Sequence, residues 1–338
     1  MENIIFLNRF GIDFRQEGRQ MYLLIGDTML QQEFCHTIKQ QLTAGTLLER
    51  EPMSRHTSFR IGGPADLFVQ PANVDELWKV LQLAREAEVP FFVMGNGSNL
   101  LVSDEGFRGM IVHTGGKLRE ISVDGDMIYA QAGALLSAVA KAAWEHGLTG
   151  MEFAAGIPGT LGGAVCMNAG AYGGEMKDIL ADVEVLTTEG ERRVLTADEM
   201  DLSYRHSAVF DKDYVVLAAH IRLSRGDQAQ IRDKMNELAG ARKAKQPLEY
   251  PSAGSTFKRP EGYFAGKLIQ DAGLKGYTVG GAQVSEKHSG FVINRGGATA
   301  EEVRFLIRQV RRKVKQQFGV DLEPEVRLLG FEDTEVIQ

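Results

Sequence analysis

The stretch from Phe153 to Gly174, FAAGIPGTLGGAVCMNAGAYGG, constrains the fold more than any other part of the chain. It contains seven glycines and no Lys, Arg, Asp or Glu. Glycine adopts left-handed backbone angles and lets other groups approach the main chain. Its entropic cost inside helices and strands argues against a regular element here. We therefore expect an ordered loop whose backbone lies against another group.

Two interpretations of this loop are open. One is a flexible surface loop. The other is a site for a diphosphate-bearing cofactor, because successive main-chain N–H groups can hold an anion without a lysine or arginine. The second is favoured, because a solvated linker does not need large apolar side chains. The stretch carries Ile157, Leu161, Val165, Met167 and Tyr172.

A second glycine-rich segment, GNGSN, runs from Gly95 to Asn99 after the apolar stretch PFFVM. Small residues at the carboxyl end of a strand are a common ligand position. A simple turn is the alternative, but the presence of two such loops in one chain favours binding. Neither loop is a Rossmann fingerprint, since Leu100 stands where the third glycine would be, and the chain contains no P-loop sequence.

Composition excludes several classes of protein. The chain has 338 residues, of which 43% are hydrophobic and 25% charged, as in a globular protein of two or three domains. A net charge of −7 argues against a general nucleic-acid-binding surface. With Cys35 and Cys166 as the only cysteines, no disulfide framework is implied and a reducing cytoplasm fits. No apolar run approaches the ~20 residues of a membrane span, and no His or Cys spacing suits a metal site.

Periodicity and turn signals predict both helices and strands, so the fold is expected to be α+β. Asn73, followed by Glu76, resembles a capping box, as do Thr299 and Glu302. Helices are expected at about residues 29–42, 73–89, 135–146, 227–245 and 299–318. Strands are expected at about residues 91–94, 110–114, 121–123, 127–133, 213–223, 290–294 and 326–329, with a further pair within residues 182–195.

Three short segments place polar residues in glycine-rich or apolar surroundings. They are SYRHS at residues 203–207, GSTFK at residues 254–258 and LEPEVR at residues 322–327. Taken alone, Arg205 suits a surface ion pair, Ser255 a turn hydroxyl and Glu325 an exposed strand position. The residues by themselves do not bring these segments together.

Seven motifs in the same order resemble the UDP-N-acetylenolpyruvoylglucosamine reductase family, also called UDP-N-acetylmuramate dehydrogenase. The motifs are TSFRIGGPAD, GNGSNLL, GIPGTLGGAVCMNAGAYG, SYRHS, GSTFKRP, HSGFVIN and LEPEVR. They extend from about Thr57 to Arg327. The short interval between Arg205 and Ser255 is similar to the shorter branch of that family, which lacks an extra tyrosine-bearing loop.

The resemblance implies a two-part FAD-binding region of the vanillyl-alcohol-oxidase/PCMH type and a smaller C-terminal α+β substrate domain. The expected division is a non-functional extension at residues 1–28, an FAD-binding region at 29–226 with subdomains 29–105 and 106–226, and a substrate domain at 227–338. The implied enzyme is cytoplasmic, a monomer or weak oligomer, and acts in peptidoglycan precursor synthesis. It uses FAD and NADPH to reduce an enolpyruvyl UDP-sugar to UDP-N-acetylmuramate, with no nucleic-acid or membrane partner.

The same resemblance implies the site residues. The catalytic ones are Arg205, which stabilises an enolate, Ser255, which protonates carbon, and Glu325, which orients or polarises the enolate, with Glu323 as a competitor for that role. The cofactor-binding residues are Gly95, Asn96, Gly97, Ser98, Asn99, Gly156, Ile157, Pro158, Gly159, Gly162 and Gly163. Tyr204, Lys258 and Gln283 are weaker candidates for substrate binding.

Two other functions remain compatible with parts of the sequence. One is a flavin oxidase or dehydrogenase acting on another sugar or hydroxy acid, against which GSTFKRP and LEPEVR argue. The other is a flavin-binding or UDP-sugar-binding module without turnover. The joint presence of Arg205, Ser255 and Glu325 argues against that module, since a sensor needs no proton donor.

Overall fold

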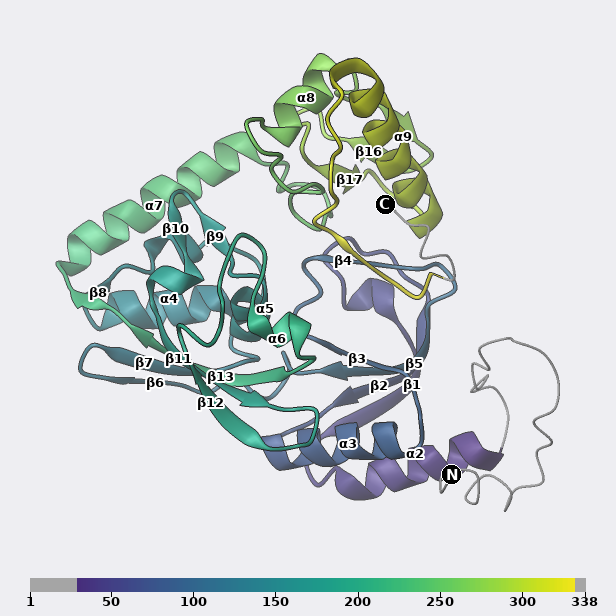
Figure 1. The fold of residues 1–338 in the computed structure, drawn as a ribbon, viewed down its shortest axis with the longest axis vertical. Coiled ribbons are helices and arrows are strands. Elements are labelled where there is room, and N and C mark those ends of the chain that lie inside the picture. Colours follow the sequence, from purple (N-terminus) through teal and green to yellow (C-terminus); the bar gives the residue numbers. More distant parts are fainter. Residues whose placement is uncertain (1–28, 332–338) are drawn as a thin grey trace.

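A computed structural model describes residues 29–331 of the chain. The expectation that residues 1–28 form a non-functional extension lies outside the described residues. The fold has three parts (Figure 1): a first sheet with its two helices, a second sheet, and a C-terminal unit reached through the long helix α7 (Gln228–Lys245). The predicted mixture of helices and strands is confirmed.

The first sheet has the strand order β1-β2-β5-β3. Its strands are β1 (Thr46–Pro52), β2 (Pro64–Gln70), β5 (Phe107–His113) and β3 (Phe91–Met94). Helices α2 (Met29–Gln41) and α3 (Val74–Glu86) lie beside one another below this sheet in Figure 1. Because β5 pairs with both β2 and β3, the expected subdomain division at residues 105/106 falls inside this sheet.

Helix α3 begins at the predicted cap but without the predicted box. Asn73 accepts a hydrogen bond from Glu76 N at 2.8 Å. The Glu76 carboxylate does not return to Asn73; it accepts from the main-chain N–H groups of Ala72, Thr43 and Ala44. A buried carboxylate is stable when several donors surround it, and here the loop after α2 supplies two of them and the residue before Asn73 the third.

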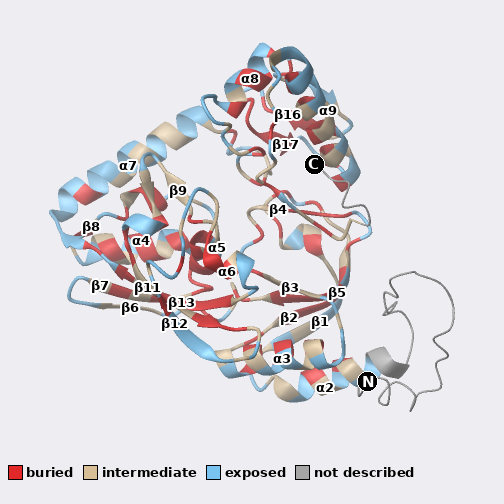
Figure 2. Ribbon diagram, viewed as in Figure 1, coloured by how far each residue is buried: buried red, intermediate tan, exposed pale blue. Residues whose placement is uncertain are grey.

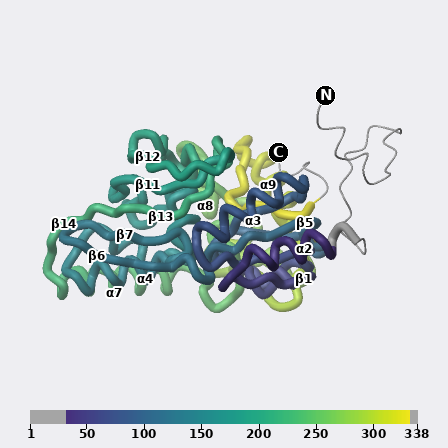
Figure 3. The backbone as a smooth tube through the Cα atoms, turned by 90° about the horizontal axis from the view of Figure 1, so that it is seen from below, coloured from purple at the N-terminus to yellow at the C-terminus, as the bar shows by residue number. Residues whose placement is uncertain are grey.

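The second sheet is antiparallel and has the order β12-β11-β13-β7-β6. Its strands are β12 (Arg192–Thr196), β11 (Leu180–Leu186), β13 (Val215–Arg222), β7 (Met127–Gln131) and β6 (Ile121–Asp124). Figure 3 shows these strands in this order across the sheet, with α4 (Leu136–Glu145) and α7 beyond β6. Leu136, Val139, Ala140 and Ala143 of α4 are buried in one core with the side chains of this sheet.

The glycine-rich stretch is only partly a loop, which corrects the prediction. It contains the 3-10 turn η3 (Glu152–Ala154), the helix α5 (Leu161–Cys166) and the short strands β9 (Gly170–Ala171) and β10 (Gly174–Glu175). Helix α5 forms because it packs on the end of β7, where Gly162 N donates to the Ala132 carbonyl at 2.8 Å. Tertiary packing here outweighs the low helix propensity of glycine.

The C-terminal unit consists of two helices on a small antiparallel sheet. The helices are α8 (Ala265–Asp271) and α9 (Ala300–Phe318). The strands are β15 (Thr278–Val279), β16 (Ala282–Val284) and β17 (Val292–Asn294). The capping box predicted for Thr299 and Glu302 is confirmed, with both reciprocal hydrogen bonds formed. Helix α9 buries one apolar stripe, while α7 is exposed along most of its length (Figure 2).

After α9 the chain returns to the segment that follows the first glycine-rich loop. Strand β18 (Arg327–Leu329) pairs in parallel with β4 (Leu100–Val102), which directly follows the first glycine loop. The remaining short elements are η2 (Met53–Arg55), β8 (Leu148–Thr149), η4 (Met176–Asp178), α6 (Ala208–Asp211) and β14 (Ser224–Arg225). None of the helices within residues 29–331 combines the length and apolar character needed to span a membrane.

Candidate active site

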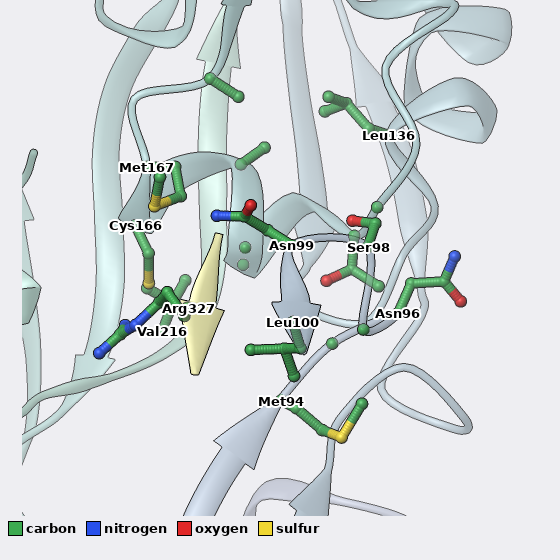
Figure 4. A pocket seen from close by; sticks show the side chains of 18 of the residues that line it. Met94, Asn96, Ser98, Asn99, Leu100, Leu136, Cys166, Met167, Val216 and Arg327 are labelled. Carbon is green, nitrogen blue, oxygen red and sulfur yellow. The ribbon is translucent and has the colours of Figure 1, made fainter. Parts of the chain in front are cut away.

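A cavity of about 730 Å³ lies between the two glycine-rich segments and is closed in part by residues of the C-terminal unit. Figure 4 shows its lining from both sides, with Ser98 and Asn99 on one segment and Cys166 and Met167 on the other. Cavities of about 300–1,000 Å³ accommodate cofactors and other small molecules. Arg205, Ser255 and Glu325, from three distant segments of the chain, also line it.

Ten of the eleven predicted cofactor residues line this cavity. The exception is Gly156: a Cβ at that position would lie 3.3 Å from Arg242 Cδ. The residues that do line the cavity are Gly95, Asn96, Gly97, Ser98, Asn99, Ile157, Pro158, Gly159, Gly162 and Gly163.

The two segments also pack on each other. Ser98 Oγ donates to the Pro158 carbonyl at 3.0 Å. A Cβ at Gly95 would lie 2.1 Å from Thr160 Oγ1, and one at Gly97, whose φ is +60°, would lie 2.1 Å from the His56 carbonyl. Both distances are too short for any side chain, so part of the glycine content serves contact between segments.

Gly162 and Gly163 have different surroundings, although both were predicted to approach the cofactor. A Cβ at Gly162 would lie 2.9 Å from Ala132 Cβ, so the missing side chain at this position permits packing of α5 on β7. A Cβ at Gly163 would have Thr160 Oγ1 as its nearest neighbour, at 3.8 Å. Gly163, which is exposed in the cavity lining, is the position where a side chain would enter the cavity.

The polar groups of the cavity fit an anionic cofactor such as FAD. Thr160 is 2% exposed, and its Oγ1 has no hydrogen-bond partner among the described residues. A buried hydroxyl without a partner is costly unless a ligand supplies one. Arg242 also lines the cavity, and burial lowers the pKa of its guanidinium, so an anion beside it would be stabilising.

Arg205 and Glu325 form a direct pair in the cavity wall. Arg205 Nε donates to Glu325 Oε1 at 2.5 Å, and both side chains are largely buried. Arg205 has φ +58° within the tight turn from Ser203 to His206, whose ends are hydrogen-bonded to each other. A non-glycine residue in this conformation costs roughly 1–2 kcal/mol. The turn thus fixes the guanidinium at an energetic cost.

Ser255 is brought to the same cavity wall by a main-chain bond of its neighbour Thr256 to Glu325. Glu325 N donates to the Thr256 carbonyl at 2.9 Å, so Ser255 and Glu325 lie on adjacent extended segments. The Ser255 side chain is exposed within the cavity lining. Burial raises the pKa of the Glu325 carboxyl, with Arg205 acting in the opposite direction.

The weaker substrate candidates divide between two places. Tyr204 and Lys258 line a second cavity of about 480 Å³, where Lys258 pairs with Glu323. Gln283 lines neither cavity. Its amide is occupied within the C-terminal sheet, where Nε2 donates to Thr278 Oγ1 at 3.0 Å and Oε1 accepts from Arg295 at 3.1 Å. The structure therefore does not bring Gln283 to the site.

The sequence interpretation missed three cations in the larger cavity, Arg85, Arg242 and Arg327. Arg327 could have been identified from the LEPEVR motif, because it stands two residues after Glu325 and strand residues at this spacing share a face. Arg242 gave no signal, since α7 is polar on most of its surface. Cys166 also lines the cavity, but burial raises the pKa of its thiol to about 12, so it stays protonated at neutral pH.

Comparison with known proteins gives concordant similarities. A family model for the C-terminal domain of UDP-N-acetylenolpyruvoylglucosamine reductase matches residues 246–329, and an FAD binding domain model matches residues 65–196. The reductase of Caldanaerobacter subterraneus subsp. tengcongensis is 55% identical over 293 residues, which cover 87% of this chain and 97% of the relative. That of Agathobacter rectalis is 54% identical over 313 residues, covering 89% and 99%. The crystal structure of the Thermus caldophilus reductase has a TM-score of 0.72 at 35% identity, covering 84% of this chain and 98% of that one.

Proposed function

The chain belongs to the UDP-N-acetylenolpyruvoylglucosamine reductase family, and on this premise we propose how its residues carry out the reaction. The protein is an FAD-dependent oxidoreductase that uses NADPH to convert UDP-N-acetyl-3-O-(1-carboxyvinyl)-glucosamine to UDP-N-acetylmuramate, in peptidoglycan precursor synthesis. Its fold is the expected FAD-binding region joined to a C-terminal α+β domain. The observation that carries the residue assignment is the convergence of Arg205, Ser255 and Glu325 on the cavity that both glycine-rich segments line.

Bound FAD supplies the hydride carrier between NADPH and the enolpyruvyl group. The chain's own contribution begins with holding it. Main-chain N–H groups of the two glycine-rich segments, the Thr160 hydroxyl and the Arg242 guanidinium are the groups placed to bind its diphosphate. Ser98 also links the two segments through its hydrogen bond to the Pro158 carbonyl.

Arg205 stabilises the negative charge that develops when hydride reaches the terminal carbon of the enolpyruvyl group. The product of that addition is a carbanion at the adjacent carbon, delocalised into the carboxylate as an enolate, and its added negative charge needs a fixed cation. A guanidinium is planar and permanently charged, and the turn from Ser203 to His206 holds it in place.

Ser255 donates the proton that the adjacent carbon must take. A hydroxyl is a weak acid, but an enolate carbon is basic enough to accept its proton. Glu325 orients Arg205 and polarises the enolate end. Glu323, the competitor for this role, pairs with Lys258 at the second cavity and does not line the larger one.

Three finer assignments belong to the same proposal. Residues 227–338 form the substrate domain, with the division placed where Asp227 caps α7. Tyr204 and Lys258 contact the UDP-sugar from the second cavity. The enzyme acts in the cytoplasm as a monomer or weak oligomer, in keeping with its two unpaired cysteines and its acidic net charge.

The visible spectrum of the purified protein tests the proposal directly. We expect flavin absorption that bleaches with NADPH under anaerobic conditions and returns on addition of the enolpyruvyl UDP-sugar. A colourless protein that neither binds added FAD nor oxidises NADPH would overturn it. Return of colour with oxygen or another sugar, but not with the enolpyruvyl substrate, would indicate a different flavin enzyme.

A further inference from the structure

Asn99 makes two contacts with the segment that carries Glu325. Its main-chain carbonyl accepts from Arg327 N at 3.0 Å, and its side-chain Nδ2 donates to the Glu325 carbonyl at 3.0 Å. Figure 4 shows Asn99 at the end of the first glycine-rich segment, immediately before β4 and close to β18. The side chain that the sequence assigned to the cofactor is therefore engaged with the segment of Glu325.

The Asn99 side chain takes a place in the β4–β18 ladder that a main-chain N–H would ordinarily fill. The strands are parallel, with Arg327 opposite Leu100. Because hydrogen bonds in a parallel pair are evenly spaced, the next one would run from the main-chain N–H of Asn99 to the Glu325 carbonyl. Nδ2 makes this bond instead. Among residues 29–331 the main-chain N–H of Asn99 has no acceptor, and Asn99 lines the larger cavity.

On the opposite side, the Glu325 segment is held by main-chain bonds and by the side-chain pair of Lys258 and Glu323. Glu325 N donates to the Thr256 carbonyl at 2.9 Å, and Lys258 N donates to the Glu323 carbonyl at 2.8 Å. The peptide groups on both sides of the Glu325 Cα atom are therefore fixed, one by the segment of Ser255 and the other by the Asn99 amide. Removing the amide frees one of them.

We propose that Asn99 is a positioning residue for Glu325, because its side-chain amide holds the Glu325 carbonyl. The inference rests on the proposed role of Glu325 in the reaction. Glu325 must keep its contact with Arg205, and a misplacement of about 1 Å at a reacting centre costs about 10²-fold in rate. The amide thus acts on the second half-reaction without touching substrate.

Asn99→Ala and Asn99→Asp test the inference, since the second keeps the shape of the side chain and removes the donor. We expect re-oxidation of pre-reduced enzyme by the enolpyruvyl substrate to slow about 10- to 100-fold. Bleaching by NADPH and the Kd of the apoprotein for FAD should stay at the wild-type values. If the side chain binds the cofactor, as the sequence suggested, the Kd for FAD rises and the inference is overturned.

Two controls separate positioning from loss of stability and from failure of the proposed function. Asn73→Ala removes a comparable side-chain bond at the cap of α3, away from the cavity, and should leave both half-reactions unchanged. A double-mutant cycle with Glu325→Ala decides the route of action: the double variant should be no slower than Glu325→Ala alone. The inference is overturned if the rate defects of the two single variants multiply in the double variant. It is also overturned if re-oxidation is slow in Glu325→Ala but normal in Asn99→Ala. Either result leaves the proposed function standing. Normal re-oxidation in Glu325→Ala overturns the inference about Asn99 and the proposed role of Glu325 together.

Discussion

The guanidinium of Arg205 and the carboxylate of Glu325 meet at 2.5 Å although the two residues are 120 positions apart in the chain. Arg205 is held by a tight turn between strands β12 and β13 of the second sheet. Glu325 lies on an extended segment that is bonded to the segment of Ser255 on one side and to Asn99 on the other. The pair lies in the wall of a cavity that the two glycine-rich segments also line. The site is thus assembled from all three parts of the fold.

The Ser255→Ala variant should separate the two half-reactions. NADPH needs no proton donor for substrate carbon, so flavin bleaching should proceed at nearly the wild-type rate. A positioned acid contributes about 10²–10⁴-fold, and anaerobic re-oxidation by the enolpyruvyl substrate should slow by that order. Single-turnover mixing of pre-reduced enzyme with substrate measures this step.

Ser252→Ala is the matched control for that prediction, because Ser252 precedes the same segment and does not line the larger cavity. It should leave both half-reactions unchanged. An undiminished re-oxidation rate in Ser255→Ala would assign the proton to another donor, such as Thr256 or a bound water.

Gly163→Val and Gly162→Val should fail in different ways. A side chain at Gly163 enters the cavity, so the protein should fold normally and bind FAD weakly. A side chain at Gly162 meets Ala132 at the contact of α5 with β7, and overpacking of this kind costs about 1–3 kcal/mol. Thermal unfolding of the apoproteins and FAD titration distinguish the two. Equal FAD affinity in wild type and Gly163→Val would contradict the proposed site.

Asp104→Ala should loosen the C-terminal unit from the first domain. The Asp104 carboxylate accepts from Ala300 N at 2.8 Å and from Glu301 N at 3.1 Å, so it caps α9 from a residue 196 positions away. Loss of a helix cap costs about 0.5–2 kcal/mol. The melting temperature of Asp104→Ala should therefore fall. That of Asp104→Asn, which keeps one acceptor, should fall less. Equal melting temperatures for wild type and Asp104→Ala would show that the cap does not stabilise the fold.

The stability of the protein should depend on pH through His113. Burial, and to a smaller extent the neighbouring His56, lowers the pKa of His113 from 6.5 to about 4. Between these values the unfolded chain binds a proton that the folded chain does not, so stability is full above pH 6.5 and declines as the pH falls toward about 4. Denaturant unfolding across this window should show a shallower decline for His113→Gln.

The slope of the unfolding free energy against pH, compared between wild type and His113→Gln, measures this dependence. An unchanged slope in His113→Gln would mean that His113 ionises alike in the folded and unfolded chains.

Local sequence determined the helix ends and much of the cavity lining. Thr299 and Glu302 form their box because both partners lie within one turn of the same helix. The two glycine-rich segments were identified from composition alone, because their backbone angles and close contacts are properties of glycine itself. Family resemblance added Arg205, Ser255 and Glu325, which no local pattern connects.

Tertiary structure decided which partner each polar side chain uses. Glu76 has the spacing of a capping box, but the loop after α2 offers its carboxylate more donors. Gln283 has its amide satisfied inside the C-terminal sheet, and Asn99 gives its amide to Glu325 instead of the cavity. Local spacing fixes what a side chain can reach within one turn, whereas its partner at long range depends on which distant segment packs beside it. For that reason the sequence predicted which backbone segments line the cavity, and only the fold showed how Arg205, Glu325 and Asn99 are held together.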